Sequence, residues 1–179
     1  MNQIDFPYIS NYYKLTELIK SMFIRKKNIN GKEYAYLIEN RYNKRKKQSR
    51  QKSTKYLGKI INLGIADTQT MASTMEEAII NELTSMGFSK KGGSLTKGDI
   101  NIDLKTSTVK EGNKDVCLEL NEGFLCTLTL TNLLRFNSNN LNEKEIIHKM
   151  AESFISSGIN LHHSSFINIY NNQIKPTNS

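Results

Sequence analysis

Positive charge is concentrated in less than a quarter of this chain. Of its 25 lysines and arginines, 14 lie between Lys20 and Lys59, where the acidic residues are Glu33 and Glu39. This segment carries a net charge of +12, and the rest of the 179-residue chain, with 11 basic and 15 acidic residues, carries −4. Charge of this density repels itself in a compact structure and resists burial, so the segment must fold with its side chains exposed. Such a segment is usually tolerated because a polyanion neutralises it.

The basic segment has the pattern of β-strands. Residues 23–27 and 33–41 are separated by a short turn that ends in Asn-Gly, which is a strong hairpin signal. A third run, residues 51–60, follows a very basic tip at residues 42–47. We therefore expect a three-stranded antiparallel sheet over residues 22–61.

Tyrosines are interleaved with the basic residues of this segment. Basic side chains that alternate with aromatic rings are typical of sheets that enter a nucleic-acid groove or stack on unpaired bases. The alternative is a solvated sheet whose tyrosines pack on a second domain. The residues expected to contact nucleic acid are Arg25, Lys26, Lys27, Lys44, Arg45, Lys46, Lys47, Arg50, Lys52 and Lys55 on phosphates, with Tyr34, Tyr36 and Tyr56 for packing or stacking.

Two parts of this segment resemble a known family. The sequence MFIRKKNINGKEYAYLIEN at residues 22–40 and the closing KYLGKI at residues 55–60 resemble the short β-rich N-terminal segment of insertion-sequence transposases and of some archaeal proteins of unknown function. The resemblance implies contact with nucleic acid and no reaction, because the long catalytic domain of those transposases has no counterpart here. Residues 1–21 precede the resemblance and are expected to be an added extension or helix, or to follow from an upstream start codon.

The pattern changes after the basic segment. Residues 62–73 are small and polar with no clear period and are expected to form a linker. Residues 74–172 combine helical and strand patterns, and residues 173–179 form a polar tail. The predicted fold class is α+β, in which the basic sheet module is followed by a small domain with a helix, a β-hairpin and two to three further helices.

Capping patterns mark the helices of this second domain. Residues 75–86 and a helix that ends at residue 157 each follow a capping box and precede a glycine. We also expect helices at residues 131–136 and 163–172. Between the first two helices, the alternating runs 100–104 and 116–120 are expected to pair as a hairpin around a turn at residues 110–113.

Four carboxylates suggest an enzymatic alternative. A helix with an acidic residue, followed by strands with further carboxylates, resembles in outline the Mg²⁺-dependent core of restriction-endonuclease-like nucleases, including junction resolvases. The final strand of that family reads Glu-any-Lys, whereas here Glu119-Leu120 is followed by Asn121. The residues that this hypothesis would use are Glu82, Asp99, Asp103 and Glu119.

The remaining candidate sites have weak sequence support. Cys117 and Cys126 are nine residues apart, and the chain has no paired ligands at the spacing of zinc sites, so we expect no metal. The basic glycine-rich stretch at residues 90–98 matches no nucleotide-binding motif. We also expect no cofactor, no membrane contact and a cytoplasmic location, because no apolar run approaches the roughly 18 residues of a membrane helix.

Three functions follow as hypotheses. The first is a non-enzymatic nucleic-acid-binding protein, for DNA or structured RNA, in which the second domain gives stability, partner contact or dimerisation. A ribosome-associated factor that binds rRNA is a variant of this hypothesis. The others are the divergent nuclease and an adaptor whose basic hairpin binds an acidic protein.

Overall fold

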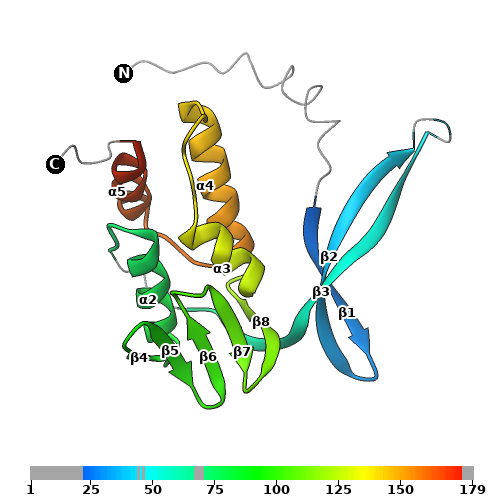
Figure 1. Ribbon diagram of the computed structural model, residues 1–179, viewed down its shortest axis with the longest axis horizontal. Helices are drawn as coiled ribbons and strands as arrows, with labels where there is room; N and C mark the ends of the chain where they lie inside the picture. The colour runs from blue at the N-terminus through cyan, green and yellow to red at the C-terminus, as the bar shows by residue number, and fades with distance from the viewer. Residues whose placement is uncertain (1–21, 44, 46, 67–70, 175–179) are drawn as a thin grey trace.

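One mixed sheet runs through the protein. The computed structural model describes residues 22–43, 45, 47–66 and 71–174. In these residues, nine strands are ordered β1-β2-β3-β8-β7-β6-β5-β4, with β9 paired to β8. Helices cover the C-terminal part of the sheet, and the N-terminal strands extend away from it (Figure 1). This arrangement confirms the predicted α+β fold with an N-terminal sheet.

The first three strands form the predicted antiparallel unit. They are β1 (Met22–Ile29), β2 (Lys32–Asn43) and β3 (Gln48–Gly64). Asn30 and Gly31 connect β1 to β2 with φ angles of 51° and 75°, the left-handed conformation that a two-residue hairpin turn requires. The β3 strand continues through residues 62–64, which the sequence pattern places in the linker, and residues 67–70 of that linker lie outside the described residues.

The β3 strand connects the two parts of the sheet. Its last residues pair in parallel with β8, from Lys59 opposite Val116 to Gly64 opposite Leu120. Gly58 lies where β3 meets β8, and a Cβ at this position would come within 2.7 Å of the Asp115 carbonyl oxygen. The strands therefore approach each other at a distance that only glycine allows.

The second part of the sheet has more strands than the predicted hairpin. The strand β7 lies between the two predicted partners and pairs with each, so the turn at residues 110–113 joins β7 to β8. The pattern missed β7 because Val109 is its one buried apolar residue. The strands are β4 (Ser89–Lys91), β5 (Ser94–Lys97), β6 (Ile100–Asp103), β7 (Thr108–Glu111), β8 (Lys114–Leu120) and β9 (Gly123–Leu125).

The helices follow their capping residues. Thr74 caps α2 and accepts from the Glu77 N–H, and Asn142 with Glu145 forms the capping box of α4. The helix α3 begins four residues earlier than expected, because Thr129 bonds back to Cys126 and fixes its first turn. The helices are α2 (Met75–Ser85), α3 (Thr127–Leu134), α4 (Glu143–Ser157) and α5 (His163–Ile174).

The strand β8 separates two apolar clusters. Leu118 and Leu120 face the main core beneath the helices, and Cys117 belongs to a smaller cluster on the other face of the sheet. Because side chains alternate along a strand, β8 is buried on both faces. The smaller cluster attaches the N-terminal sheet to the rest of the molecule. In the described residues no helix has the length and apolar character to cross a membrane.

Candidate nucleic-acid interface

The two faces of the N-terminal sheet have different surroundings. One face, which we call the anchored face, packs on β8, β9 and α3. Its buried residues Ala35, Leu57 and Ile60 meet Cys117 and Cys126. Burial of these side chains holds the sheet against the second part of the protein. The opposite face is therefore the one that the first three strands can present to a ligand.

This opposite face, which we call the tyrosine face, carries a cluster of three rings. The ring centroid of Tyr56 lies 5.4 Å from that of Tyr36 and 6.2 Å from that of Tyr34. The Lys27 ammonium lies 4.4 Å from the centre of the Tyr36 ring, a cation–π distance. Tyr56 is 50% exposed, so the cluster presents aromatic surface to solvent. The structure therefore brings together all three tyrosines predicted from the sequence.

Strand irregularities contribute to the tyrosine cluster. The pairing of β2 with β3 shifts between Ala35 and Tyr36 and again between Leu37 and Ile38. Bulges of this kind strengthen the local twist and redirect side chains. Tyr36 is consequently opposite Arg25 on one side and Tyr56 on the other. Burial of its hydroxyl, together with Tyr34, Tyr36 and Asp115, raises the pKa of Tyr56, which favours the neutral phenol.

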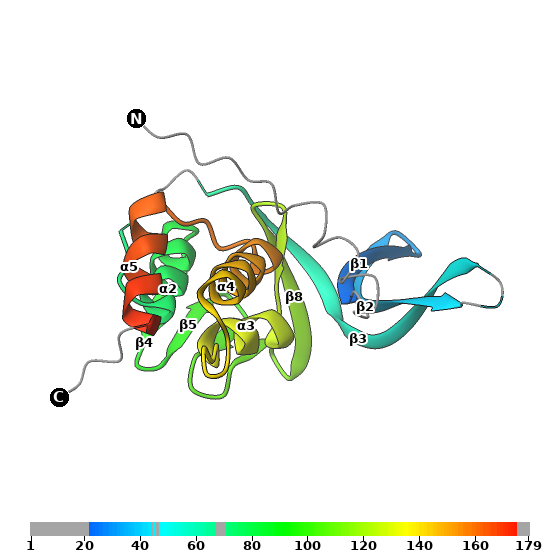
Figure 2. The same cartoon turned by 90° about the horizontal axis from the view of Figure 1, so that it is seen from above.

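Beyond the cluster, β2 and β3 extend away from the other strands. We call the described residues 40–43, 45 and 47–56 the arm. Its outer part, from Asn40 opposite Gln51 to Asn43 opposite Gln48, has two strands, because β1 pairs with β2 only as far as Glu39 and β8 pairs with β3 only from Lys59. It projects from the body of the protein (Figures 1 and 2). Arg45, Lys47 and every residue of β3 from Gln48 to Tyr56 are exposed.

The arm includes several of the expected phosphate contacts. Arg50, Lys52 and Lys55 lie on its exposed strand, and Arg45 and Lys47 lie at its tip. Lys44 and Lys46, which the sequence also predicts as contacts, lie outside the described residues. Arg25 lies at the base of the arm and donates to Gln51 Oε1 at 2.7 Å.

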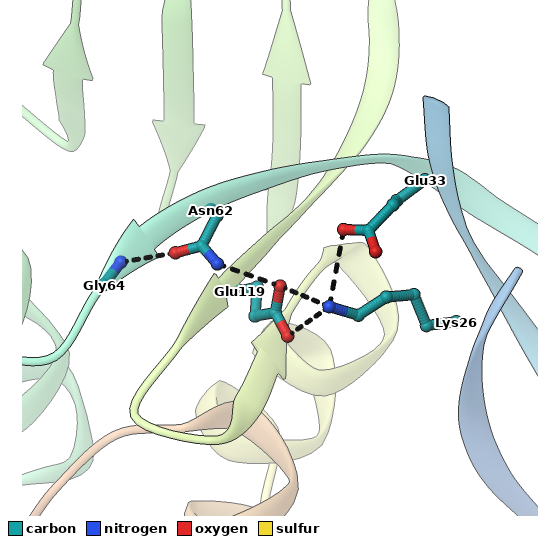
Figure 3. Close-up of polar contacts among 5 residues, drawn as sticks. All are labelled: Lys26, Glu33, Asn62, Gly64 and Glu119. Atoms are coloured by element: carbon teal, nitrogen blue, oxygen red, sulfur yellow. Dashed lines mark hydrogen bonds and ion pairs between the residues drawn. The ribbon is translucent and has the colours of Figure 1, made fainter. Parts of the chain in front are cut away.

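Lys26 has a different environment from the other predicted contacts. Its ammonium lies 2.8 Å from Glu119 Oε1 and 3.4 Å from Glu33 Oε2, as Figure 3 shows. The hydrogen bond to Glu119 is the main cause of the raised pKa of Lys26. Asn62 also donates to Glu119, at 3.3 Å. Lys26 thus joins the N-terminal sheet to β8, and the geometry gives it a structural role.

The four carboxylates of the nuclease hypothesis are not gathered into one site. Glu119 pairs with Lys26, and Glu82 is buried on α2, where Asn121 donates to its Oε1. Asp103 accepts from the Thr106 N–H at 2.9 Å, which lowers its pKa, and Asp99 lies in the exposed turn before β6. Within the described part of the chain, no group of three or more His, Cys, Asp or Glu side chains could hold a metal ion.

Glu82 and Asn121 form a structural contact that the sequence did not reveal. Burial raises the pKa of Glu82, against the opposing effect of hydrogen bonds from Asn121 and the Asn160 backbone. Asn121 also donates to the Gly158 carbonyl at 2.9 Å and accepts from the Ala66 N–H at 2.8 Å. One amide therefore joins α2, the end of α4 and the end of β3. Asn121 lies in the two-residue turn between β8 and β9 and has a φ of 45°. A polar residue that favours such a turn is the one sequence feature that marks this position.

Cys117 and Cys126 are nine residues apart in the sequence, a spacing too long for one half of a zinc site, but they are neighbours in the fold. The β8–β9 hairpin pairs Leu118 with Leu125, so the same register places Cys117 opposite Cys126. Both thiols are free and buried. The Cys117 thiol donates to Cys126, which raises the pKa of Cys117 and lowers that of Cys126. They belong to the small apolar cluster under the anchored face.

Comparisons with known proteins identify no relative: no family model, curated protein or solved structure matches this chain. The case for function therefore depends on the chain's own geometry and charge.

Proposed function

We propose that this protein binds nucleic acid through the tyrosine face and the arm. The observation that carries the proposal is the asymmetry of the N-terminal sheet. Its anchored face is buried against β8, β9 and α3, whereas the other face exposes an aromatic cluster that continues into a basic arm. The resemblance to transposase segments supports the same proposal.

The charge of the arm supports a polyanionic ligand. Between Asn40 and Tyr56 the sequence has eight basic residues and no acidic residue. The side chains described on β3 in this stretch are exposed. Phosphate groups would relieve this repulsion and release their own counterions, which makes binding favourable at low salt.

The aromatic cluster supports bases or sugars as the neighbours of those phosphates. Tyr56 is half exposed, and its neutral phenol can donate a hydrogen bond. Stacking on a tyrosine is worth about 1–3 kcal/mol per base. Lys27 beside Tyr36 places a cation at the same surface. An adaptor for an acidic protein would use the charge but would not need the rings.

Titration with fluorescent nucleic acids tests this proposal. The probes are a single-stranded DNA, a DNA duplex and a structured RNA, each measured by fluorescence anisotropy at several salt concentrations. The test variant changes Arg45, Lys47, Lys52 and Lys55 to glutamine. The matched control variant makes the same charge change at four exposed lysines of the second part, Lys90, Lys91, Lys144 and Lys149.

We expect the arm variant to lose affinity and the control variant to keep it. If all four side chains contact duplex phosphates, the slope of log K against log salt becomes shallower by about 3.6. Equal losses in the two variants would show non-specific attraction and contradict the proposal. Discrete rRNA sites, recovered by crosslinking from cells, would identify the ribosome-associated form of this function.

A further inference from the structure

We infer that the arm enters the major groove of double-stranded DNA and that Arg50 and Gln48 contact base edges there. This inference rests on the proposed nucleic-acid binding and adds the class of nucleic acid and the roles of individual residues. Its evidence is the shape of the arm and the order of the residues across its two strands.

The arm has only two strands over its outer part. The β1 strand ends its pairing at Glu39, and the β8 strand begins its pairing at Lys59. The β2–β3 ladder continues alone from Asn40 opposite Gln51 to Asn43 opposite Gln48. Because no other described strand covers either edge of this part, the walls of a groove can surround it.

The dimensions of such a ribbon select one groove. The major groove of B-form DNA, about 12 Å wide and 8.5 Å deep, admits a two-stranded β-ribbon, and the minor groove, about 6 Å wide, does not. The major groove of A-form RNA is deep and too narrow for side chains to read. The four cross-strand pairs of the outer arm extend roughly 10–13 Å at 3.3 Å per residue, which is enough to reach the groove floor.

The β3 strand of the outer arm has exposed side chains that suit base edges. Arg50 and Gln48 are both exposed and lie two residues apart, so they share one face of the ribbon. Arginine makes paired hydrogen bonds with guanine, and asparagine or glutamine makes them with adenine.

The base of the arm has a different environment. Gln51 accepts a hydrogen bond from Arg25 and so belongs to this base. The exposed Lys52 shares the face of Arg50 and Gln48 but lies further from the tip, opposite Glu39, where β1 still pairs with β2, so it would meet the phosphates that border the groove. We therefore assign Arg50 and Gln48 to bases, and Lys52 to the phosphate backbone.

A DNA duplex with a filled major groove tests the groove assignment. The probes are a mixed-sequence DNA duplex of about two helical turns, the same duplex with glucosylated 5-hydroxymethylcytosine, the RNA duplex of the same sequence and one DNA strand. The sugar projects into the major groove and leaves the minor groove open. We expect at least about tenfold weaker binding to the glucosylated and RNA duplexes, and no effect of distamycin, which occupies the minor groove.

Selection from a random duplex pool tests the roles of the residues. The wild type is expected to select a consensus, and the double substitution Gln48→Ala with Arg50→Ala is expected to lose it. The Lys52→Ala variant should keep the consensus with uniformly lower affinity. Absence of a wild-type consensus, or its persistence in the double variant, would overturn the assignment of Arg50 and Gln48 to bases.

The outcomes separate this inference from the function on which it rests. Binding to the glucosylated duplex, the RNA duplex or the single strand as tightly as to plain DNA duplex overturns the major-groove inference and leaves nucleic-acid binding intact. Binding to none of the four probes overturns both.

Discussion

The two halves of β3 belong to one continuous strand and have opposite environments. From Gln48 to Tyr56 every side chain is exposed, and the strand pairs only with β2. From Leu57 onward buried and exposed positions mix, and at Lys59 the pairing passes from β2 to β8. The first half has six polar uncharged or aromatic residues and three basic ones, whereas the second half holds the apolar residues Leu57, Ile60, Ile61 and Leu63.

This difference separates binding from attachment within a single strand. Side-chain burial stabilises the second half, so its position relative to the body of the protein is fixed. The first half is held by its backbone ladder, and its side chains remain available to a ligand. Substitutions in the second half should therefore change stability, and substitutions in the first half should change binding.

The largest expected effect is at Gly58, where the two halves meet. A Cβ in Gly58→Ala would lie 2.7 Å from both the Asp115 carbonyl oxygen and the Val116 Cα, and φ is 138°. We expect the free energy of unfolding to fall by about 3 kcal/mol or more, measured by urea denaturation. The control is Gly31→Ala, where φ is also positive but no atom lies within 4 Å. Its expected loss is about 1 kcal/mol, and equal losses would contradict the role of the close approach.

The next effect is the loss of an apolar side chain from the packed half. Leu57 is 6% exposed and lies in the cluster under the anchored face. We expect Leu57→Ala to lower the free energy of unfolding by about 2–4 kcal/mol. Lys55→Ala, two residues earlier on the exposed half, should change it by less than about 0.5 kcal/mol. A comparable loss of unfolding free energy in both variants would contradict the proposal that only the second half of β3 stabilises the fold.

A pH-dependent effect is expected in the body of the protein and not in the arm. Burial raises the pKa of Glu82, so folding favours its protonated form. Its contribution to stability is fully present below 4.5, the usual glutamate value, and is lost as pH rises through the higher folded-state pKa. Glu82→Gln keeps the acceptor for Asn121 and removes this dependence.

Melting temperatures of the wild type and Glu82→Gln across a pH series measure this effect. The variant should be the more stable protein near neutral pH, and the difference should shrink as pH falls toward 4.5. A difference that does not vary with pH would show that Glu82 ionisation is not the cause. For Arg50→Gln, the curve of melting temperature against pH is expected to have the same shape as that of the wild type.

A smaller effect is expected for the ion pair that joins the sheet to β8. The side chains of Lys26 and Glu119 are 34% and 19% exposed, so solvent screens their attraction only in part. Lys26→Met should cost about 0.5–1 kcal/mol of unfolding free energy, and added salt should reduce the loss. Lys27→Met, on the tyrosine face, should leave stability nearly unchanged and weaken nucleic-acid binding. If Lys27→Met lowered stability and Lys26→Met weakened nucleic-acid binding, the assignment of attachment to the anchored face and of binding to the tyrosine face would be wrong.

The smallest effect on stability is expected in the arm. Arg45→Gln with Lys52→Gln should change the free energy of unfolding by less than about 0.5 kcal/mol, because both residues are exposed. The salt slope for duplex DNA should nevertheless become shallower by about 1.8 if both contact phosphates. A large loss of stability with unchanged binding would show that the arm is a structural element.

The sequence predicted features that depend on local chemistry. The Asn-Gly turn, the Thr74 cap of α2, the capping box of α4 and the N-terminal three-stranded sheet all follow from residues that are close in the chain. It also identified the three tyrosines that meet on one face, because they alternate with basic residues.

Contacts between distant segments could not be predicted. The parallel pairing of β3 with β8 places Glu119 beside Lys26, and no local pattern marks a partner so far along the chain. The strand β7 was missed because one apolar residue, Val109, gives no alternation. The separation of the four carboxylates followed from the same long-range pairing, which directs Glu119 toward Lys26 and leaves Glu82 on the opposite side of β8.

The parallel pairing of β3 with β8 also has a consequence for how the chain acquires its structure. Antiparallel hairpins such as β1–β2 close quickly, but Lys59 cannot pair until Val116, 57 residues further along the chain, is present. During synthesis the ribosome needs seconds to add that many residues. Over that interval the basic hairpins can form while the apolar side chains of Leu57 and Ile60 lack the surface that later covers them. The high charge beside these residues would then discourage association between nascent chains, a role that ends when β8 arrives.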